Sequence, residues 1–397
     1  MENVNLLVSY NSEIIRKNKN KLVYSVFNQS ITGDNIKEII GKIGKYKNIK
    51  SMYFQLINCT FEDILVILIF ESLILHLLKS DVKIYMQVKL LEDPQYSINN
   101  ELFLKSPIRV TLDKSQEVKN NFYKLDEKIY YEYYYALSPT QVYGLNENKE
   151  HFRLFVSKET IQDRKLMNKV IKKLRLYLEK VLGEEKNKEI KQLILELITN
   201  IKEHALSDLI VEVVVLDAID NRTNELVQYI TVGLISYSKQ QLYSKIEDFY
   251  QKVDNQMHVG SLLEAEYSLL SEINASHQLL TNDDSNEYEH EHMRMLQTFQ
   301  DGVTGREESF GNDSGTGLAN TIKIISMRTS DETGLSYVYS GNHICYFRTN
   351  SLIFDNKICT FNTIGDYKQL PDESIYEKSS VFFPGTAFHL IFPIEKG

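Results

Sequence analysis

The chain has 397 residues, of which 43% are hydrophobic and 25% are charged, and its formal net charge at pH 7 is −9. A hydrophobic fraction near the globular average excludes a wholly disordered or fibrous protein, and the acidic balance makes nucleic acid an unlikely main partner. At roughly 100–200 residues per domain, the length predicts two or three domains with sizeable cores.

The three cysteines, Cys59, Cys345 and Cys359, are too few and too scattered for a disulfide framework or a CxxC metal site. The first residues show no basic segment followed by an apolar one, so no signal peptide is expected. The most apolar stretch, residues 64–78, is interrupted by Glu71 and falls short of the ~20 apolar residues that a membrane span needs. We therefore expect a soluble cytoplasmic protein with no membrane partner.

Residues 1–112 alternate between strand and helix patterns, and Asp34 is placed to cap the first helix. This order predicts a partly parallel sheet covered by helices, and therefore an α/β domain. The predicted elements are strands over 21–27, 51–57 and 82–88, and helices over 34–46 and 61–79.

Residues 113–160 are rich in tyrosine and have no clean period, which predicts a connector that packs against one of the two domains. Its cluster Tyr130–Tyr135 has no interleaved basic residues, so packing or a partner surface is expected rather than base stacking.

Residues 161–397 are predicted to form a second α/β domain. Helical spacing runs from 158 to 205 with a break near Gly183, and a Gly-rich loop opens a later helix. This order predicts an α/β sandwich with a mixed sheet. The other predicted elements are strands over 210–217 and 226–237, a polar and mostly helical tract over 239–308, a helix over 317–327 and a last strand over 386–392.

The strongest local motif places Glu196, Asn200 and His204 every fourth residue along a predicted helix, and therefore on one face of it. An amide oxygen can ligate a hard cation while a neighbouring carboxylate orients or deprotonates a water, which suits magnesium chemistry. The alternative from these residues alone is an ordinary solvated polar stripe.

A second motif places Gly311, Gly315 and Gly317 before an amphipathic helix that begins near Leu318. Glycines at this point let backbone N–H groups approach an anion, and a helix N-terminus favours phosphate. No Gly-Lys-Ser/Thr follows, so the loop is not a P-loop, and no strand leads directly into it, which disfavours a dinucleotide-binding turn.

Three segments together resemble the GHKL ATPases, a family that includes DNA gyrase, heat-shock chaperones and histidine kinases. Glu196-Leu-Ile-Thr-Asn200, with His204-Ala205, resembles the N-box, and Gly315-Thr-Gly-Leu318 resembles the second glycine box. The segment 384–393 resembles the Gly-Thr turn and strand that close such domains.

The resemblance implies Mg²⁺ and ATP as cofactors. Glu196 would orient or deprotonate the attacking water, and Asn200 would ligate Mg²⁺. Residues 239–316 would form a long ATP lid, in which Arg306 either reaches a phosphate or is solvated. The nucleotide-binding set would be Asn200, His204, Ser236, Ser238, Arg306, Gly311, Gly315, Thr316, Gly317, Leu318 and Thr386.

The sequence departs from the family at the first glycine box. The family has an aspartate there that accepts a hydrogen bond from the adenine amino group, whereas residues 232–242 contain no Asp. Ser236 or Ser238 would have to replace it. Losing a buried hydrogen bond of this kind costs roughly 1–3 kcal/mol, which weakens binding without necessarily abolishing it.

The N-terminal pattern resembles a STAS-type domain, in which a strand ends at a loop that opens a helix. The corresponding loop offers Thr60 at most for phosphorylation, so a phospho-switch is not expected. We expect an ATPase or regulatory protein that couples its nucleotide state to binding of a protein partner. Homodimerisation also stays open.

Two other functions remain open: a catalytically silent nucleotide-sensing module, and a protein serine kinase like those of anti-sigma relatives. A sensor histidine kinase is disfavoured because residues 158–203 contain no histidine. His290 and His292 look like metal ligands, but i,i+2 histidines on a helix point to different sides. A solvated acidic segment over 283–291 is the expectation there.

Overall fold

The computed structural model divides the chain into two compact units, Met1–Leu137 and Ser138–Gly397. Each unit has its own sheet and helices and is described by itself. The structure describes residues 14–18, 20–45, 48–91, 102–104, 106–135, 151–183, 187–204, 207–219, 226–238, 240–244, 246, 268, 270–277, 290–300, 317–329, 336–355 and 358–394.

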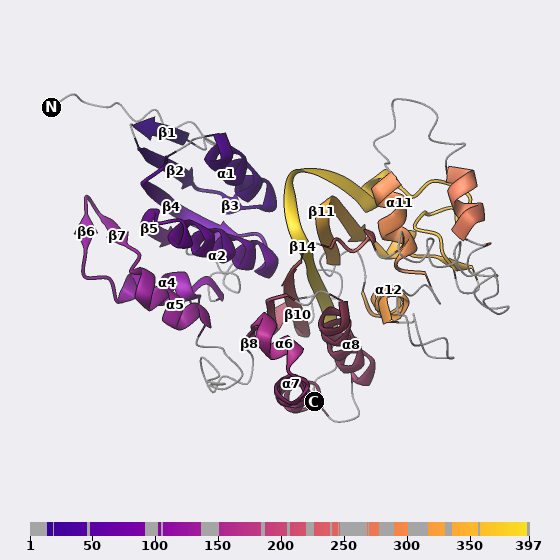
Figure 1. The fold of residues 1–397 in the computed structure, drawn as a ribbon. Helices are drawn as coiled ribbons and strands as arrows, with labels where there is room; N and C mark the ends of the chain where they lie inside the picture. Colours follow the sequence, from indigo (N-terminus) through magenta and orange to yellow (C-terminus); the bar gives the residue numbers. More distant parts are fainter. Residues whose placement is uncertain are drawn as a thin grey trace. The chain divides into compact units, whose positions relative to one another are not determined.

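The first unit contains a mixed sheet with strand order β1-β2-β4-β5-β7-β6, and β3 pairs with β4 (Figure 1). Strands β2, β4 and β5 are parallel, which confirms the predicted partly parallel sheet. The strands are β1 (Ile14–Asn18), β2 (Lys21–Phe27), β3 (Ser30–Ile31), β4 (Ser51–Phe61), β5 (Lys83–Leu90), β6 (Val118–Lys119) and β7 (Phe122–Lys124).

The helices α1 (Gly33–Lys45) and α2 (Ile64–Lys79) connect the parallel strands and contact each other. Alternate residues of β4, among them Met52, Phe54 and Leu56, are buried. Cys59 is also buried and donates its Sγ hydrogen to the Val26 carbonyl at 3.2 Å, so it is a core residue as expected.

The start of α1 differs from the prediction. Thr32, not Asp34, caps the helix, because the Asn35 N–H donates to Thr32 Oγ1 at 3.4 Å and the Thr32 N–H donates to Asn35 Oδ1 at 2.8 Å. Asp34 lies inside the first turn, where it pairs with Lys37. This reciprocal pattern satisfies two backbone donors at once.

Residues 113–160 are divided between the two units. The tyrosine cluster forms α5 (Glu127–Tyr135) in the first unit, whereas β8 (His151–Val156) belongs to the second. Tyr130 and Tyr134 are buried, and the Tyr130 hydroxyl donates to the Glu71 carbonyl of α2 at 2.8 Å. These two tyrosines therefore have the packing role that was one of the two expectations. A short helix, α4 (Pro107–Asp113), contacts α5.

The sheet of the second unit is antiparallel throughout the described strands, so the prediction of a mixed sheet there was wrong. Its strand order is β11-β14-β10-β9-β8, and a separate two-stranded sheet pairs β12 with β13. The remaining bounds are β9 (Leu209–Ile219), β10 (Leu226–Tyr237), β11 (Ser336–Phe347), β12 (Phe354–Asp355), β13 (Ile358–Cys359) and β14 (Tyr376–Ile394).

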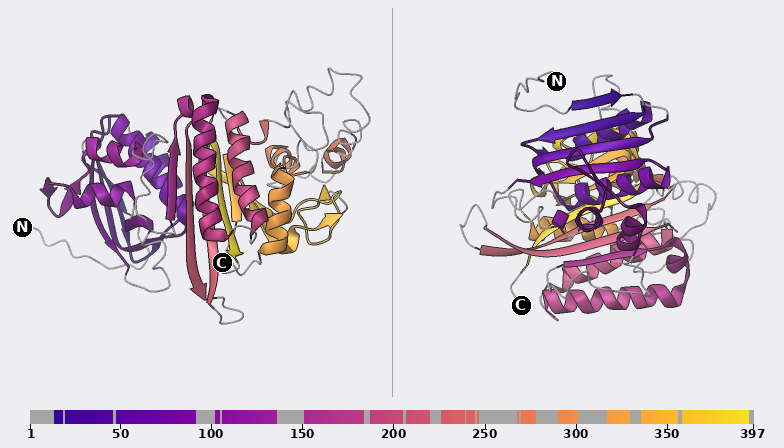
Figure 2. Two further views of the ribbon diagram at one scale, coloured as in Figure 1. Left: turned by 90° about the horizontal axis from the view of Figure 1, so that it is seen from below. Right: turned by 90° about the vertical axis from the view of Figure 1, so that its left-hand side faces the viewer.

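A pair of long helices explains the antiparallel pairing of β8 with β9. The chain leaves β8 through α7 and returns through α8, which contact each other and lie side by side over one face of the sheet (Figure 2). Two antiparallel helices bring the chain back to the end of the sheet from which it left, whereas one helix would give a parallel pair. The helices are α6 (Lys158–Gln162), α7 (Arg164–Leu182), α8 (Lys188–His204), α11 (His290–Gln297) and α12 (Gly317–Arg328), with 3-10 turns η2 (Thr349–Ser351) and η3 (Glu373–Ile375).

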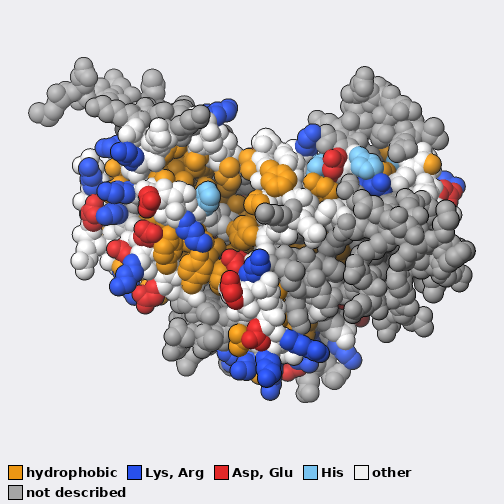
Figure 3. Space-filling model, viewed as in Figure 1, with side chains coloured by type: hydrophobic (Ala, Val, Ile, Leu, Met, Phe, Trp, Pro, Cys, Tyr) orange, Lys and Arg blue, Asp and Glu red, His pale blue; other side chains and the backbone are white. Residues whose placement is uncertain are grey.

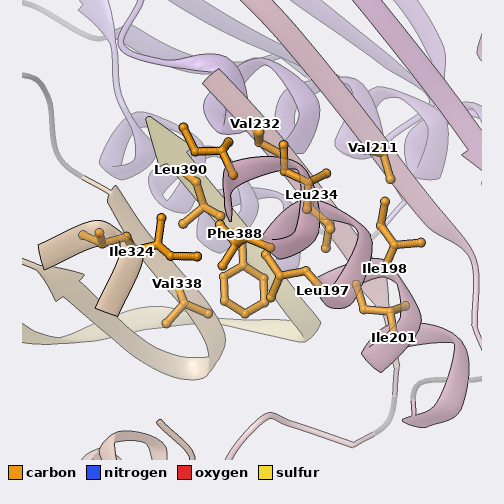
Figure 4. Close-up of a cluster of buried hydrophobic side chains, with 14 of the residues drawn as sticks. Leu197, Ile198, Ile201, Val211, Val232, Leu234, Ile324, Val338, Phe388 and Leu390 are labelled. Atoms are coloured by element: carbon orange, nitrogen blue, oxygen red, sulfur yellow. The ribbon is translucent and has the colours of Figure 1, made fainter. Parts of the chain in front are cut away.

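The core of the second unit lies between the sheet and this helix layer (Figure 4). Alternate strand residues face it, and α8 covers them with Leu197, Ile198 and Ile201. The period of two in the strands and of about 3.6 in the helix brings both apolar faces together. The labelled strand residues are Val211, Val232, Leu234, Val338, Phe388 and Leu390.

His292 does not lie in a solvated segment as expected. It is fully buried on α11, its Nε2 lies 3.2 Å from the Glu377 carbonyl oxygen, and its ring packs edge-on against His343. Met293, Met295 and Leu296 are buried on the same helix. His292 is therefore buried because it lies on the side of α11 that packs into the core. The acidic residues 283–289 lie outside the described residues.

Within the described part of the chain, no helix combines the length and apolar character that crossing a membrane requires. The most apolar one, α2, has 16 residues, most of them buried in the first unit. That is the core helix expected for this stretch.

Candidate functional site

A cavity in the second unit brings together residues from four separated parts of the sequence. It lies between α8, the end of β10, the start of α12 and the Gly-Thr segment of β14. Its described lining residues are Leu197, Asn200, Ile201, Ser236, Ser238, Gln240, Gln241, Leu242, Leu318, Thr386 and Phe388. Five of the predicted site residues are among them.

Helix α8 presents Asn200 to this cavity together with the apolar Leu197 and Ile201. Glu196 lies one turn earlier on the helix and is half-buried, but it is not among the lining residues. The helix ends at His204, whose side chain lies outside the described part. Among the described side chains of the predicted polar face of α8, the Asn200 amide is therefore the one that lines the cavity.

The end of β10 contributes Ser236 and Ser238, the two candidates named above for the place of the missing aspartate. Ser236 is buried, pairs in register with Thr386 of β14, and its hydroxyl lies 3.2 Å from that of Ser207. The Ser238 N–H donates to the Pro384 carbonyl at 3.1 Å, and its Oγ accepts from the Gln240 N–H at 3.0 Å. Both serines are thus fixed beside the cavity by neighbouring backbone.

The Gly-Thr segment lies inside the continuous strand β14 rather than in a turn. Gly385 has φ of +134°, and a methyl group at this position would lie 1.9 Å from the Ser236 carbonyl oxygen. Only glycine allows the two strands to approach this closely. This close approach places Thr386 against Ser236 at the edge of the cavity.

Ser340 of β11 is a supporting residue that the sequence did not indicate. Its buried hydroxyl donates to the Gly385 carbonyl at 2.8 Å, accepts from the Leu242 N–H at 2.8 Å, and lies 3.2 Å from Thr386 Oγ1. One side chain therefore ties the segment after β10 to β14. No local motif surrounds Ser340, and only the pairing of β11 with β14 brings it here.

The predicted glycine loop is described only at its end. Helix α12 begins at Gly317, and Leu318 lines the cavity. The start of a helix beside the cavity is where the phosphate-binding prediction placed it. Arg306, Gly311, Gly315 and Thr316 lie outside the described residues.

The described lining is neutral: hydroxyls and amides over an apolar floor, with no carboxylate or basic side chain among these residues. Amide oxygens such as that of Asn200 suit a hard cation. Within the described residues, no three His, Cys, Asp or Glu side chains are grouped so as to hold a metal ion. A metal here would therefore have to take most of its ligands from a bound phosphate and water.

The cavity volume is about 50 Å³, compared with roughly 300–1,000 Å³ for pockets that hold small molecules. A ligand of nucleotide size would therefore have to extend beyond this cavity or widen it.

Comparisons of the chain with protein-family models, with curated proteins and with solved structures found no match.

Proposed function

We propose that residues 138–397 form a nucleotide-binding domain of the GHKL type and that Mg-ATP binds in the cavity beside Asn200. In this proposal the bound nucleotide regulates the interaction with a protein partner, and the first unit serves as a STAS-like regulatory domain. The helices that connect parallel strands in the first unit support that part of the proposal.

One observation carries the proposal. The three segments on which the family resemblance rests lie far apart in the sequence, yet Asn200, Leu318 and Thr386 line a single cavity. A solvated polar stripe on α8 would not require the other two segments beside it. Their convergence supports a common ligand.

The lining has suitable chemical groups for the base and for the metal ion of Mg-ATP. Leu197, Ile201 and Phe388 offer an apolar floor for a base. The Ser236 hydroxyl can accept or donate a hydrogen bond, so it can serve an amino group where a carboxylate is lacking. The Asn200 amide would ligate Mg²⁺, whose other ligands would be phosphate and water, and the metal would neutralise phosphate charge.

The cavity volume makes opening part of the proposal. Because about 50 Å³ cannot hold a nucleotide, the proposal includes a widening of the cavity in which the start of α12 and residues 240–242 move away from α8. Such opening is a common step at ligand sites built from loops and helix ends.

A silent nucleotide sensor is the second candidate, and the position of Glu196 favours it. This carboxylate is the only predicted water-orienting group, and it is not among the described residues that line the cavity. Binding without turnover would follow if Glu196 cannot reach the terminal phosphate.

Calorimetric titration of the full chain with ATP and ADP, with and without Mg²⁺, tests the proposal. We expect saturable binding that weakens by roughly 1–3 kcal/mol in Ser236→Ala, and a Mg²⁺-dependent loss of affinity in Asn200→Ala. Thr199→Ala is the matched control, because the Thr199 hydroxyl donates a hydrogen bond to the Leu195 carbonyl at 2.9 Å and Thr199 does not line the cavity.

Absence of binding at millimolar nucleotide would overturn the proposal. If ATP binds, phosphate release by Glu196→Ala separates the two candidates. A hydrolysing enzyme loses turnover in this variant and keeps binding, whereas the silent sensor shows no turnover in either protein.

A further inference from the structure

Helix α7 is strongly basic within an acidic chain. Residues 164–182 carry seven Lys or Arg and one acidic side chain, Glu179, so the helix contributes +6 to a formal charge of −9 and leaves −15 on the rest of the chain. Lys and Arg side chains gather over α7 at the lower edge of the space-filling view (Figure 3). This charge is separate from the cavity described above.

The basic side chains lie on the exposed face of the helix. Met167, Val170, Leu174 and Leu178 bury the opposite face against the core. In the described part of the chain, no ion pair forms to the exposed cations Arg164, Lys165, Lys169, Lys172, Arg175 and Lys180. Six exposed cations that form no ion pair among the described residues favour an anionic ligand.

Leu176 lies in the middle of this basic face and is 55% exposed. Lys165, Lys169, Lys172, Leu176 and Lys180 are spaced by three or four residues and so form one stripe. At 1.5 Å per residue the stripe is about 22 Å long. It combines cations along its length with one apolar side chain, Leu176, between Lys172 and Lys180.

This combination distinguishes between anionic partners. An apolar centre surrounded by charge is typical of protein interfaces, whereas contacts to phosphates of a nucleic acid need no leucine. A membrane-surface helix turns a broad apolar face to the lipid, but that face of α7 is buried in the core.

We propose that the exposed face of α7 binds a short acidic, amphipathic segment of a partner protein, with Leu176 as the apolar contact. The flanking lysines give the segment its orientation and speed its approach. The proposal does not depend on nucleotide binding.

Fluorescence anisotropy with the full-length chain tests it. The probe is a labelled acidic peptide of about 15 residues, with Glu on one helical face and a Leu among them, a helical length that matches the stripe. We expect the triple variant Lys165→Glu, Lys169→Glu, Lys172→Glu to weaken binding about tenfold or more. Leu176→Ser should weaken it severalfold without a change in charge.

The control triple variant Lys45→Glu, Lys50→Glu, Lys119→Glu changes the net charge by the same amount at exposed sites of the first unit. It should bind the peptide like the wild type. Circular dichroism establishes that each variant is folded, and Leu176→Ser provides a test if the α7 triple variant is not.

Three results would overturn the proposal: no binding of the peptide by the wild type, equal losses in the α7 and control variants, or no effect of Leu176→Ser. A duplex DNA and vesicles containing phosphatidylserine are run in parallel. Tighter, α7-dependent binding of either would replace the protein segment by that polyanion.

Discussion

Gly385 fixes the geometry of the candidate site at the scale of a single residue. Its φ is +134°, and a Cβ added to it would lie only 1.9 Å from the Ser236 carbonyl oxygen, so there is no space for a side chain. The strand can pack closely against β10 only because this residue has no Cβ. The position of Thr386 at the cavity therefore depends on Gly385, the residue before it.

We expect Gly385→Ala to lower the free energy of unfolding by at least ~1–3 kcal/mol, because both backbone strain and a clash must be accommodated. Urea denaturation measures the change. Gly41→Ala is the control: it lies inside α1 with nothing within 4 Å of the added methyl group, and it should stabilise by roughly 0.5–1 kcal/mol. Equal effects of the two substitutions would contradict this account.

At the scale of elements, the start of α1 shows which of two suitable residues acts as the N-cap. Both Thr32 and Asp34 are acceptable N-cap residues by type, but only Thr32 exchanges hydrogen bonds with Asn35. Asp34 instead forms an exposed ion pair with Lys37 at 2.9 Å.

Thr32→Ala should therefore destabilise the protein by ~0.5–2 kcal/mol, and Asp34→Ala by at most ~1 kcal/mol because an exposed pair contributes little. Thermal unfolding of the two variants, compared at matched pH and salt, gives the ranking. A larger loss for Asp34→Ala would restore that residue as the cap.

A buried charge cluster holds the edge strand β8 to β9. Glu212 lies 2.8 Å from His151 Nε2 and 3.4 Å from Arg153 Nη1, and all three side chains are buried. Burial by itself would raise the pKa of Glu212, but the Arg153 charge and the hydrogen bond from His151 outweigh it and lower this pKa below the usual 4.5. The folded state therefore favours the carboxylate.

The sign of the pH dependence follows from this lowered pKa. The stabilisation is fully present above 4.5, the value for the unfolded chain, and is lost as pH falls through the lower value of the folded state. Glu212→Gln should cost about 3–5 kcal/mol at neutral pH, because it leaves the Arg153 charge buried and without its carboxylate. The substitution should also make the free energy of unfolding fall less steeply as the pH is lowered through the acid range.

Denaturant unfolding as a function of pH measures both effects. Glu189→Gln is the control, because Glu189 pairs with Arg328 at 3.1 Å with its side chain 55% exposed. Its effect should stay within ~1 kcal/mol. An unchanged acid slope in Glu212→Gln would exclude the cluster as its source.

At the scale of the whole molecule, the two units have separate sheets and separate apolar cores. A unit with its own core is able to fold by itself. We therefore expect residues 138–397, produced alone, to unfold cooperatively and to keep the nucleotide affinity of the full chain. Thermal unfolding and calorimetry measure this, and loss of cooperative unfolding in the fragment would show that the first unit is required.

Elements with strong periodicity could be predicted from the local amino-acid pattern alone. Alternation in β2 and β4, and helical spacing in α7 and α8, place apolar residues on one face, so the local pattern predicts each of these elements and its buried side. The acidic composition, the absence of a predicted membrane span and the Asn200 motif were readable for the same reason: they depend on residues close together in the chain.

How these elements combine depends on contacts between distant parts of the chain. The antiparallel sheet of the second unit follows from two helices returning the chain between β8 and β9, and periodicity does not report strand direction. Burial of His292, the role of Ser340 and the contact of Gly385 with Ser236 each depend on strands or helices from distant parts of the chain. Such contacts are set by packing between elements, which a local sequence pattern does not contain.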